Sequence, residues 1–467
     1  MTQVQSSSSA QIESQYQRQR TFFDGGGTSS YKVRRQQLKT LYKLVHENES
    51  AILKALDQDF GKPPMEAFAT EVGIVLEEIN YALQHLERWM QPKRVDTPLL
   101  TAFSKSTIYY QPKGVVLIIA PWNYPFQLAM SPLIAALAAG NTAIVKPSEL
   151  TPNTAILIEE LLQKYFAAEW VCVVQGEGAS VVPQLINTLH FDHIFFTGSV
   201  PVGREIAKLA APKLIPVTLE LGGKSPVIVD ETANFKVAAQ RIALGKWMNA
   251  GQTCVAPDYL LLQEDIADQF LQTLKEVYAS FSGGSYLENE RYARLVSEKH
   301  LKRQEKMLEG AEIVYGGKVD YNTRKMELTM VKVKEADHAL LQEEIFGPVL
   351  PVLTYKTKEE ARDMIRKNPD PLALYLFSTK RNRQKYFVEN LRFGGGMING
   401  TLMYLSNPEL PFGGIGTSGM GNYHGHQGFL TFSHQKSVMK QPNWFNPSFI
   451  YPPHKSWALK LMRWVMR

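Results

Sequence analysis

The first quarter of the chain carries apolar residues at the spacing of amphipathic helices. One helix is predicted over 38–45, a second ends at Gly61, and alternating three- and four-residue steps predict a long helix over 72–90. The stretch 1–20 is polar and rich in Gln and Ser, so we expect a flexible arm. The three glycines at 25–27 are expected to form a loop before the first helix.

Beyond Gln91-Pro92 the pattern changes to the two-residue period of strands. The stretch 107–111 is predicted to be one arm of a β-ribbon that leaves the domain. From Gly114 onward, short apolar strands alternate with helices, which predicts a parallel, doubly wound sheet. The expected elements are strands at 115–120, 143–145, 171–174 and 194–196, and helices from Ser131-Pro132 to Gly140 and from Thr151-Pro152 onward.

A second α/β unit is expected to begin near Val217. Its first strands are predicted at 217–221 and 226–229, and its first helix at 236–248. The chain has no internal repeat and no long linker, so the domains are expected to pack closely.

The composition indicates an ordinary soluble globular protein. Of the 467 residues, 44% are hydrophobic and 21% charged, which excludes a mostly disordered, collagen-like or coiled-coil chain. The net charge of +6 is scattered, so no nucleic-acid partner is expected. The two cysteines, Cys172 and Cys254, make neither a disulfide framework nor a CxxC metal pair, which favours a reducing compartment and no metal site. Without a secretory signal or a long apolar run, a cytoplasmic location is the expectation.

The sequence Gly251-Gln252-Thr253-Cys254 follows the helix predicted over 236–248. Most cysteines are small buried apolar residues, and Cys172 within its apolar strand is interpreted in this way. A cysteine after a Gly-containing turn can instead lie where backbone amides stabilise an anion. A thiolate there is a strong nucleophile towards a carbonyl carbon. Residue type alone leaves both interpretations open for Cys254.

Glu220 lies at the end of an apolar strand, in Leu219-Glu220-Leu221-Gly222-Gly223-Lys224. A carboxylate in such a place costs free energy unless it is paired or functional. One interpretation pairs Glu220 with Lys224 or another buried cation. The other makes it a general base whose pKa is raised by burial.

Further polar groups follow predicted strands at their carboxyl ends, where open α/β sheets bind ligands. Asn123 is either a turn residue or a side-chain donor to an oxyanion. The run from Gly198-Ser199 to Gly203 is either a plain capped helix start or a phosphate-binding one, although the strict GxGxxG spacing is absent. Lys146 and Glu149 are either solvent-exposed or bind the hydroxyls of an adenosine ribose.

Together and in this order, these motifs closely resemble those of the aldehyde dehydrogenase superfamily. The resemblance runs from about Phe22 to the C-terminus. The segment from Phe412 to Gly425 and the basic, aromatic tail look most like the class-three branch, which includes fatty aldehyde dehydrogenases. The motifs are Pro121-Trp122-Asn123, Lys146-Pro147-Ser148-Glu149, Phe196-Thr197-Gly198-Ser199, Leu219-Glu220-Leu221-Gly222-Gly223, Gly251-Gln252-Thr253-Cys254, Glu343-Glu344-Ile345-Phe346-Gly347-Pro348 and Pro411-Phe412-Gly413-Gly414.

The resemblance implies an α/β fold with a Rossmann-type cofactor domain, an α/β catalytic domain and a β-ribbon for oligomerisation. A strand near 428–440 is expected to join the ribbon, whose exposed edges a second subunit would cover. A homodimer is therefore expected. The expected domains are the NAD(P)-binding domain at 1–93 and 115–218, the catalytic domain at 219–405, and the ribbon with the C-terminal tail at 94–114 and 406–467.

The resemblance further implies NAD(P)-dependent oxidation of an aldehyde to a carboxylic acid. Cys254 would form a thiohemiacetal and then a thioester, Asn123 and the Cys254 backbone N–H would hold the oxyanion, and Glu220 would activate the hydrolytic water. NAD is expected, with NADP as the alternative, because Glu149 would bind a free 2′-hydroxyl and repel a 2′-phosphate. The implied cofactor contacts are Trp122, Lys146, Glu149, Gly198, Ser199, Gly203, Leu221, Glu344 and Phe346.

The small-molecule substrate is expected to be an apolar aldehyde, of medium or long chain or otherwise bulky. Gly400-Thr401 departs from the commonest family pattern in a region expected to line the substrate tunnel. The candidate substrate contacts are Tyr124, Trp247, Thr401 and Phe412.

The tail, 451–467, is predicted to contain a short amphipathic helix. Three interpretations are open: a helix docked on its own subunit, a cap at the substrate entrance, and weak peripheral contact with a membrane. The cap is favoured, with membrane contact as its companion, and it is the basis for expecting long substrates. The apolar face carries Trp457, Leu461, Trp464 and Val465, while Lys460, Arg463 and Arg467 lie elsewhere.

Two alternatives to the hydrolytic enzyme remain. An acylating enzyme would pass the thioester to coenzyme A, but such enzymes usually lack the carboxylate that Glu220 supplies. A catalytically idle ligand-binding protein could share the fold, because a fold does not fix a function. The presence of Cys254, Glu220 and Asn123 argues against it.

Overall fold

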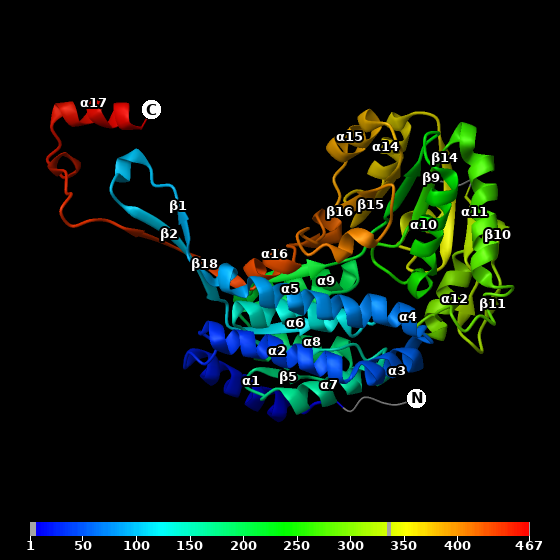
Figure 1. Ribbon diagram of the computed structural model, residues 1–467, viewed down its shortest axis with the longest axis horizontal. Helices are drawn as coiled ribbons and strands as arrows, with labels where there is room; N and C mark the ends of the chain where they lie inside the picture. The colour runs from blue at the N-terminus through cyan, green and yellow to red at the C-terminus, as the bar shows by residue number, and fades with distance from the viewer. Residues whose placement is uncertain (1–5, 334–337, 467) are drawn as a thin grey trace.

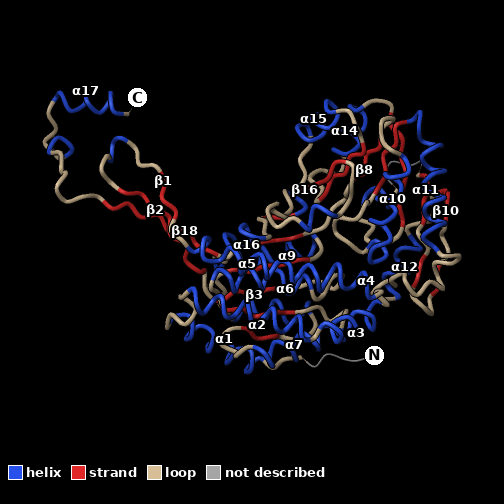
Figure 2. The backbone as a smooth tube through the Cα atoms, viewed as in Figure 1, coloured by secondary structure: helices blue, strands red, loops and turns tan. Residues whose placement is uncertain are grey.

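The computed structural model, which describes residues 6–333 and 338–466, is built around two β-sheets that face each other across a cleft. A three-stranded ribbon leaves the first of these units and ends far from both sheets (Figure 1). The backbone trace shows helices on both sides of each sheet (Figure 2). This is the α/β class predicted from the sequence.

The first sheet has the strand order β17-β7-β6-β3-β4-β5. All its strands run parallel except β17, which pairs antiparallel with β7 at one edge. This order is that of a doubly wound sheet, in which the connections leave the neighbours β3 and β6 in opposite directions. The strands are β3 (Val115–Ile119), β4 (Thr142–Lys146), β5 (Val171–Val173), β6 (His193–Thr197), β7 (Val217–Glu220) and β17 (Gly419–Met420).

Helices cover both faces of this sheet, and the alternation along β3 shows why. Val116 and Ile118 belong to a core with α2, α5, α6 and α7, whereas Val115 and Leu117 belong to a core with α1, α8 and α9. Strands buried on both faces must be continuously apolar, as these are. The helices are α1 (Ser9–Asp24), α2 (Tyr31–Glu47), α3 (Glu49–Phe60), α4 (Pro64–Ala67), α5 (Gly73–Met90), α6 (Gln127–Ala139), α7 (Pro152–Tyr165), α8 (Gly178–Thr188) and α9 (Val200–Ala210).

The expectation of a flexible arm over 1–20 is wrong for the described part of that stretch; residues 1–5 lie outside the described residues. Ser8 caps α1, whose side chains Ile12 and Tyr16 are buried against the first sheet. The Gln19 amide donates to the Ala143 carbonyl at 2.9 Å. A helix with so few apolar residues is stable here through tertiary contacts, which the local pattern did not reveal.

The start predicted for the helix before Gly140 is also wrong. The helix α6 begins at Gln127, so Pro132 lies inside it rather than in its first turn. The Glu71 carboxylate accepts hydrogen bonds from the Phe126 and Gln127 backbone N–H groups at 3.0 and 3.1 Å. This cap comes from a residue 55 positions away, which no local signal could reveal.

The second sheet has the order β10-β13-β14-β9-β8-β15-β16 and is parallel except for β10. Its strands are β8 (Pro226–Val229), β9 (Tyr259–Gln263), β10 (Glu312–Tyr315), β13 (Thr329–Lys332), β14 (Val349–Tyr355), β15 (Ala373–Phe377) and β16 (Gly395–Ile398), with a separate pair β11 (Val319–Asp320) and β12 (Lys325–Met326). Its helices are α10 (Phe235–Trp247), α11 (Ala267–Ser282), α12 (Glu298–Lys306), α13 (Ala339–Gln342), α14 (Lys358–Arg366) and α15 (Arg381–Asn390).

The chain passes from the first sheet to the second between Glu220 and Pro226. The strand β7 pairs with β6 in the first sheet, whereas the sequence predicted that a second α/β unit begins with it. The apolar runs that form β7 and β8 look alike, so the pattern does not tell which sheet each joins. The last residue of β7 therefore lies where the two units meet.

The ribbon contains β1 (Lys93–Val95), β2 (Lys105–Pro112) and β18 (Ser433–Lys440), all antiparallel. It is the ribbon predicted from the period change after Gln91-Pro92. A C-terminal strand joins it as expected, but this strand begins at Ser433 rather than near 428, because 425–431 form a helix. The helix α16 (Gly425–Thr431) precedes β18 in the chain and packs on α5 and α6. Most side chains of the ribbon are exposed, and α6 and α16 contact only the end of the ribbon nearest the first sheet.

The tail helix α17 (Ser456–Val465) lies beyond the ribbon and away from both sheets (Figure 1). Ala458 is its one buried residue among those described, and Trp464 is 73% exposed. The helix is therefore neither docked on the body of its own chain nor placed over its own chain's cavities. Arg467 lies outside the described residues. Within the described ranges, no helix is long and apolar enough to cross a membrane.

Candidate active site

The carboxyl ends of three parallel strands of the first sheet lie next to the second unit. Asn123 follows β3, Ser199 follows β6, and Glu220 ends β7. The strands β3 and β6 are the neighbours from which the connections diverge, and ligands of doubly wound sheets bind at that point. The turn that carries Cys254 comes from the second unit and lies against the same edge.

The turn before Cys254 is left-handed over three consecutive residues. After α10 the chain enters a short helical turn, η4 (Met248–Gly251), in which Asn249, Ala250 and Gly251 have φ of 51°, 52° and 73°. A Cβ on Gly251 would lie 2.2 Å from the Gly347 carbonyl oxygen, so only glycine fits there. Non-glycine residues adopt this conformation at a cost of about 1 kcal/mol each, so other contacts must hold the turn.

Those contacts are hydrogen bonds between the turn and the segment after β3. The Asn249 side-chain amide donates to the carbonyls of Asn123 and Gln252 at 2.7 and 3.1 Å. The Asn123 side-chain amide donates to the same Gln252 carbonyl at 3.1 Å. The Tyr124 and Thr253 hydroxyls form a further bond of 2.6 Å. These hydrogen bonds fix Asn123 beside the turn that precedes Cys254, where its side-chain amide can donate a hydrogen bond to an oxyanion.

Glu220 is 2% exposed, and neither carboxylate oxygen has a hydrogen-bond partner among the described residues. Lys224 does not neutralise it, because Lys224 forms a buried ion pair with Asp258 instead. Burial therefore raises the pKa of Glu220 well above its ordinary value. Of the two interpretations from sequence, the geometry supports the general base over the ion pair.

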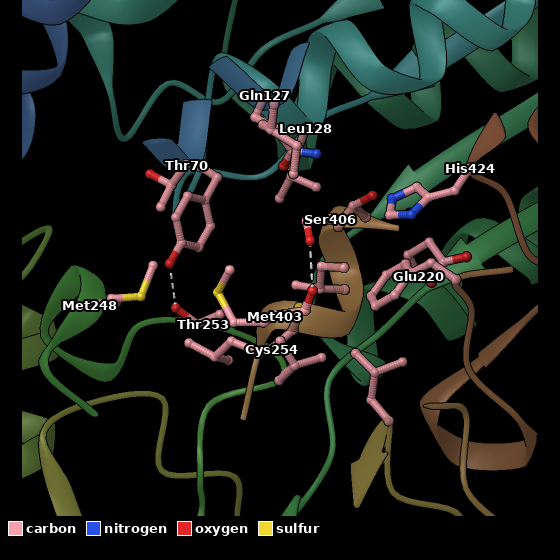
Figure 3. A pocket seen from close by; sticks show the side chains of 18 of the residues that line it. Thr70, Gln127, Leu128, Glu220, Met248, Thr253, Cys254, Met403, Ser406 and His424 are labelled. Atoms are coloured by element: carbon pink, nitrogen blue, oxygen red, sulfur yellow. Dashed lines mark hydrogen bonds between the residues drawn. The ribbon is translucent and has the colours of Figure 1, made fainter. Parts of the chain in front are cut away.

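Cys254 borders the same cavity as Glu220 (Figure 3). Burial and the neighbouring Glu344 and Glu220 carboxylates together raise the pKa of its thiol to about 12, although its own backbone amide and that of Val255 oppose the shift. The thiol is therefore protonated at neutral pH in this cavity, and a positive charge nearby would favour the thiolate. Cys172, as expected, is a buried core residue of β5.

A cleft of about 550 Å³ lies on one side of Cys254. The predicted cofactor contacts Trp122, Gly198, Ser199, Leu221, Glu344 and Phe346 all line it. The sequence missed His300 and Arg303, which line it from α12 and carried no recognisable signal. Arg303 donates to the Glu344 and Ile345 carbonyls at 2.6 and 2.9 Å, so it holds the loop that carries Glu344 and Phe346.

This cleft fits a dinucleotide. The helix α9 begins at the cleft with no side chain capping its first amides, which leaves them free for a phosphate. The buried Thr197 hydroxyl, also in the lining, has no hydrogen-bond partner among the described residues. A Cβ on Gly222 would lie 2.0 Å from a Glu344 carboxylate oxygen, so the backbone there approaches the carboxylate closely.

Three predicted cofactor residues lie outside this lining. Lys146 and Glu149 form an ion pair of 2.5 Å at the end of β4, and Glu149 accepts from the Gly178 backbone N–H at 2.9 Å. The ion pair lowers the pKa of Glu149 although burial opposes the shift. Gly203 lies inside α9 against Leu221, where it allows helix and strand to pack closely.

A second cavity, of about 150 Å³, lies on the other side of Cys254. The predicted substrate residues Tyr124 and Phe412 line it. The sequence did not identify most of the other residues that line the wall, because they come from distant segments brought together by the fold. These include Thr70, Ile74, Gln127, Leu128, Met248, Thr253, Leu402, Met403, Leu405, Ser406, Tyr423 and His424.

Two predicted substrate residues are not in the lining of that cavity. Trp247 packs in an aromatic cluster with Phe281, Tyr286 and Tyr292 inside the second unit. The Thr401 hydroxyl donates to the Arg241 carbonyl at 2.7 Å, and the next residue, Leu402, faces the cavity instead. Sequence position near the site did not reveal the direction of either side chain.

The chain is similar to proteins of one family along almost its whole length. A family model described as the aldehyde dehydrogenase family matches residues 1–438. The chain is 48% identical to 4,4'-diaponeurosporen-aldehyde dehydrogenase of Staphylococcus aureus over 446 residues, covering 95% of this chain and 97% of the relative. It is 42% identical to aldehyde dehydrogenase family 3 member A2 of Macaca fascicularis, covering 92% of this chain and 88% of that one.

The chain is also similar to solved structures along almost its whole length. The substrate-bound state of Staphylococcus aureus AldH has a TM-score of 0.94 and 47% identity, covering 98% of this chain and 99% of that one. A betaine aldehyde dehydrogenase of the same organism, in complex with NAD+, has a TM-score of 0.85 and 27% identity, covering 96% and 90%.

The raised pKa of the Cys254 thiol gives a testable pH dependence. Only the thiolate reacts with iodoacetamide, and a pKa of about 12 keeps its fraction rising throughout the neutral range. The alkylation rate constant of the cofactor-free protein should therefore increase about tenfold per pH unit from pH 7 to 9. Mass spectrometry of the Cys254 peptide measures it, with Cys254→Ser as the control. A rate that levels off near pH 8.5 would contradict the raised pKa.

Proposed function

Because this chain belongs to the aldehyde dehydrogenase family, we propose that it oxidises apolar aldehydes to carboxylic acids through a covalent intermediate on Cys254, with NAD or NADP as hydride acceptor. The observation that carries this proposal is that the two cavities meet at the reactive groups. Both Cys254 and Glu220 line the cleft and the apolar cavity alike. An aldehyde in one cavity and a nicotinamide in the other would meet at the sulfur.

In the first step the Cys254 sulfur attacks the carbonyl carbon, and the carbonyl oxygen becomes an oxyanion. The Asn123 side-chain amide and the Cys254 backbone N–H donate to it, which stabilises the thiohemiacetal. The thiol proton is released to solvent as the thiolate forms, which a positive charge nearby would favour, so this step does not need Glu220. Loss of a hydride then converts the thiohemiacetal into a thioester.

The cofactor is proposed to lie in the cleft lined by Trp122, Ser199 and Phe346. An oxidised nicotinamide supplies there a hydride acceptor and a positive charge that lowers the pKa of neighbouring acids. The α9 amides would bind the pyrophosphate, and Glu344 would bind the nicotinamide ribose. Lys146 and Glu149 are proposed to contact the adenosine ribose, since they lie at the carboxyl end of the next strand, β4.

Hydrolysis of the thioester completes the reaction. Glu220 accepts a proton from a water molecule as the water oxygen attacks the thioester carbon. The carbon–sulfur bond then breaks, the carboxylic acid leaves, and Cys254 is restored. The presence of this base in the cavity favours water over coenzyme A as the acceptor.

The lining of the apolar cavity supports a hydrophobic substrate. Its wall is formed mainly by aliphatic, methionine and aromatic side chains, which favour apolar ligands. A similar relative is named for 4,4'-diaponeurosporen-aldehyde. We therefore propose medium- or long-chain or otherwise bulky aldehydes as substrates.

The proposed domains follow the two sheets except at β17 and the end of β7, which pair within the first sheet. Residues 1–93 and 115–218 form the NAD(P)-binding domain, 219–405 the catalytic domain, and 94–114 with 406–467 the ribbon and tail. The ribbon supports a homodimer, because its strand edges and faces are exposed in the single chain. In such a dimer we propose that α17 caps the substrate entrance of the second subunit, with weak membrane contact of its exposed aromatic side chains as a companion role.

Two substitutions separate the catalytic steps. Cys254→Ala should abolish reduction of NAD by decanal, because no covalent intermediate can form. Glu220→Gln should still give a burst of NADH of about one equivalent, followed by steady-state turnover lower by about 10²- to 10⁴-fold, because only deacylation needs the base at this stage. Stopped-flow absorbance of NADH measures both.

The same assay tests the alternatives. Unaltered steady-state turnover of Glu220→Gln would refute its assignment as the base. Turnover that requires coenzyme A would identify an acylating enzyme. A wild-type protein that reduces neither NAD nor NADP with any of several apolar aldehydes would favour a catalytically idle protein.

Deletion of residues 456–467 tests the role of the tail. If α17 caps a substrate entrance, the deletion should lower kcat/KM for decanal by about tenfold more than for propanal, because only the long chain reaches the cap. Sedimentation of the full chain at micromolar concentration checks the premise, since a monomeric mass would contradict the dimer. Equal losses for both aldehydes would contradict the cap.

A further inference from the structure

Three charged side chains are buried next to the turn that precedes Cys254. They do not contact the side chains of Cys254 or Glu220. Lys62, Glu66 and Glu71 come from the short segment that joins α3 to α5 through α4 and a π-helical turn, η1 (Phe68–Val72). Lys62 and Glu71 are fully buried, and Glu66 is 9% exposed. Burial of charged groups costs free energy, and a buried ion pair adds little to the stability of a protein. A geometric role therefore explains these three buried side chains better than a stabilising one.

Glu71 holds the segment that carries Asn123. One carboxylate oxygen pairs with the Lys62 ammonium at 2.6 Å. The other accepts from the backbone N–H groups of Phe126 and Gln127 at 3.0 and 3.1 Å. The start of α6 is thereby fixed four residues after Asn123. The Lys62 ammonium also lies 4.4 Å from the centre of the Tyr124 ring, which is a cation–π contact to the residue next to Asn123.

Glu66 stabilises the turn that precedes Cys254. Its carboxylate accepts from the Asn249 backbone N–H at 2.7 Å, in the first of the three left-handed residues. The Asn249 side chain in turn donates to the carbonyls of Asn123 and Gln252. The segment between α3 and α5 therefore holds both parts of the oxyanion site. Glu71 binds the loop after β3, and Glu66 binds the turn before Cys254.

We infer that Glu66, backed by the buried Lys62–Glu71 ion pair, is a positioning residue that holds Asn123 and the Cys254 backbone amide in register around the substrate oxyanion. The inference rests on the proposed function, because it assigns these residues to the same oxyanion. Donors to an oxyanion act only when they are pre-oriented, and small misplacements cost large factors in rate. None of the three residues lines either cavity.

The test compares Glu66→Ala with Glu66→Gln, which retains an acceptor oxygen of the same reach. Glu66→Ala should lower the rate constant of the NADH burst with decanal by about 10- to 100-fold. The dissociation constant for NAD and the alkylation rate of Cys254 by iodoacetamide should change by less than about threefold, because neither needs the oxyanion site. Glu66→Gln should recover most of the burst rate. Glu389→Gln, in an exposed ion pair on α15, is the matched control.

Two outcomes would overturn the inference: a Glu66→Ala burst equal to that of wild type, or parallel losses of burst, NAD binding and alkylation, which indicate general disruption. Hydrogen–deuterium exchange gives a readout without catalysis. In Glu66→Ala, exchange should rise in both segments 121–127 and 247–254 and not elsewhere. If wild type gives no NADH at all, the proposed function fails, and the exchange data alone decide whether the two segments depend on Glu66.

Discussion

The left-handed turn before Cys254 is the constraint on which the rest of the site depends. Three residues in succession adopt positive φ, and two of them, Asn249 and Ala250, are not glycine. Such a turn persists only when its surroundings determine it. Here the surroundings are the loop after β3, the Gly347 backbone against Gly251, and the buried charges behind it. The turn thereby fastens one unit to the other at the point where both cavities open.

The second feature is electrostatic. Glu220, Cys254 and Glu344 lie in a poorly solvated space, and burial raises the pKa of each; that of Glu344 reaches about 8. The buried cation Lys224 is already paired with Asp258. Burial therefore disfavours the charged form of each of these acids, and a cation in the cleft would favour it. Such coupling would restrict thiolate formation to the complex with an oxidised cofactor, which protects the sulfur from side reactions.

The sequence predicted the elements whose pattern is local. Continuous apolar runs revealed β3 to β8, and the change of period after Gln91-Pro92 revealed the ribbon. Errors arose where distant residues decide: α1 is stabilised by the sheet beneath it, α6 is capped by Glu71, and β7 joins the first sheet by pairing with β6. At the site, the resemblance to the aldehyde dehydrogenase superfamily implied that Cys254, Glu220 and Asn123 act together, and all three line the cleft. The sequence could not reveal that Trp247 turns into an aromatic cluster, or that Glu66 supports the turn, because side-chain direction depends on packing.

The central claim is that Cys254 carries the substrate as a thioester between the two cavities. Peptide mass spectrometry of enzyme quenched in acid within milliseconds of mixing with NAD and decanal tests this claim most directly. The account predicts that the Cys254 peptide gains the mass of one decanoyl group, only when NAD is present, while the Cys172 peptide is unchanged. An unmodified Cys254 peptide during active turnover, or an acyl group on another residue, would contradict the account.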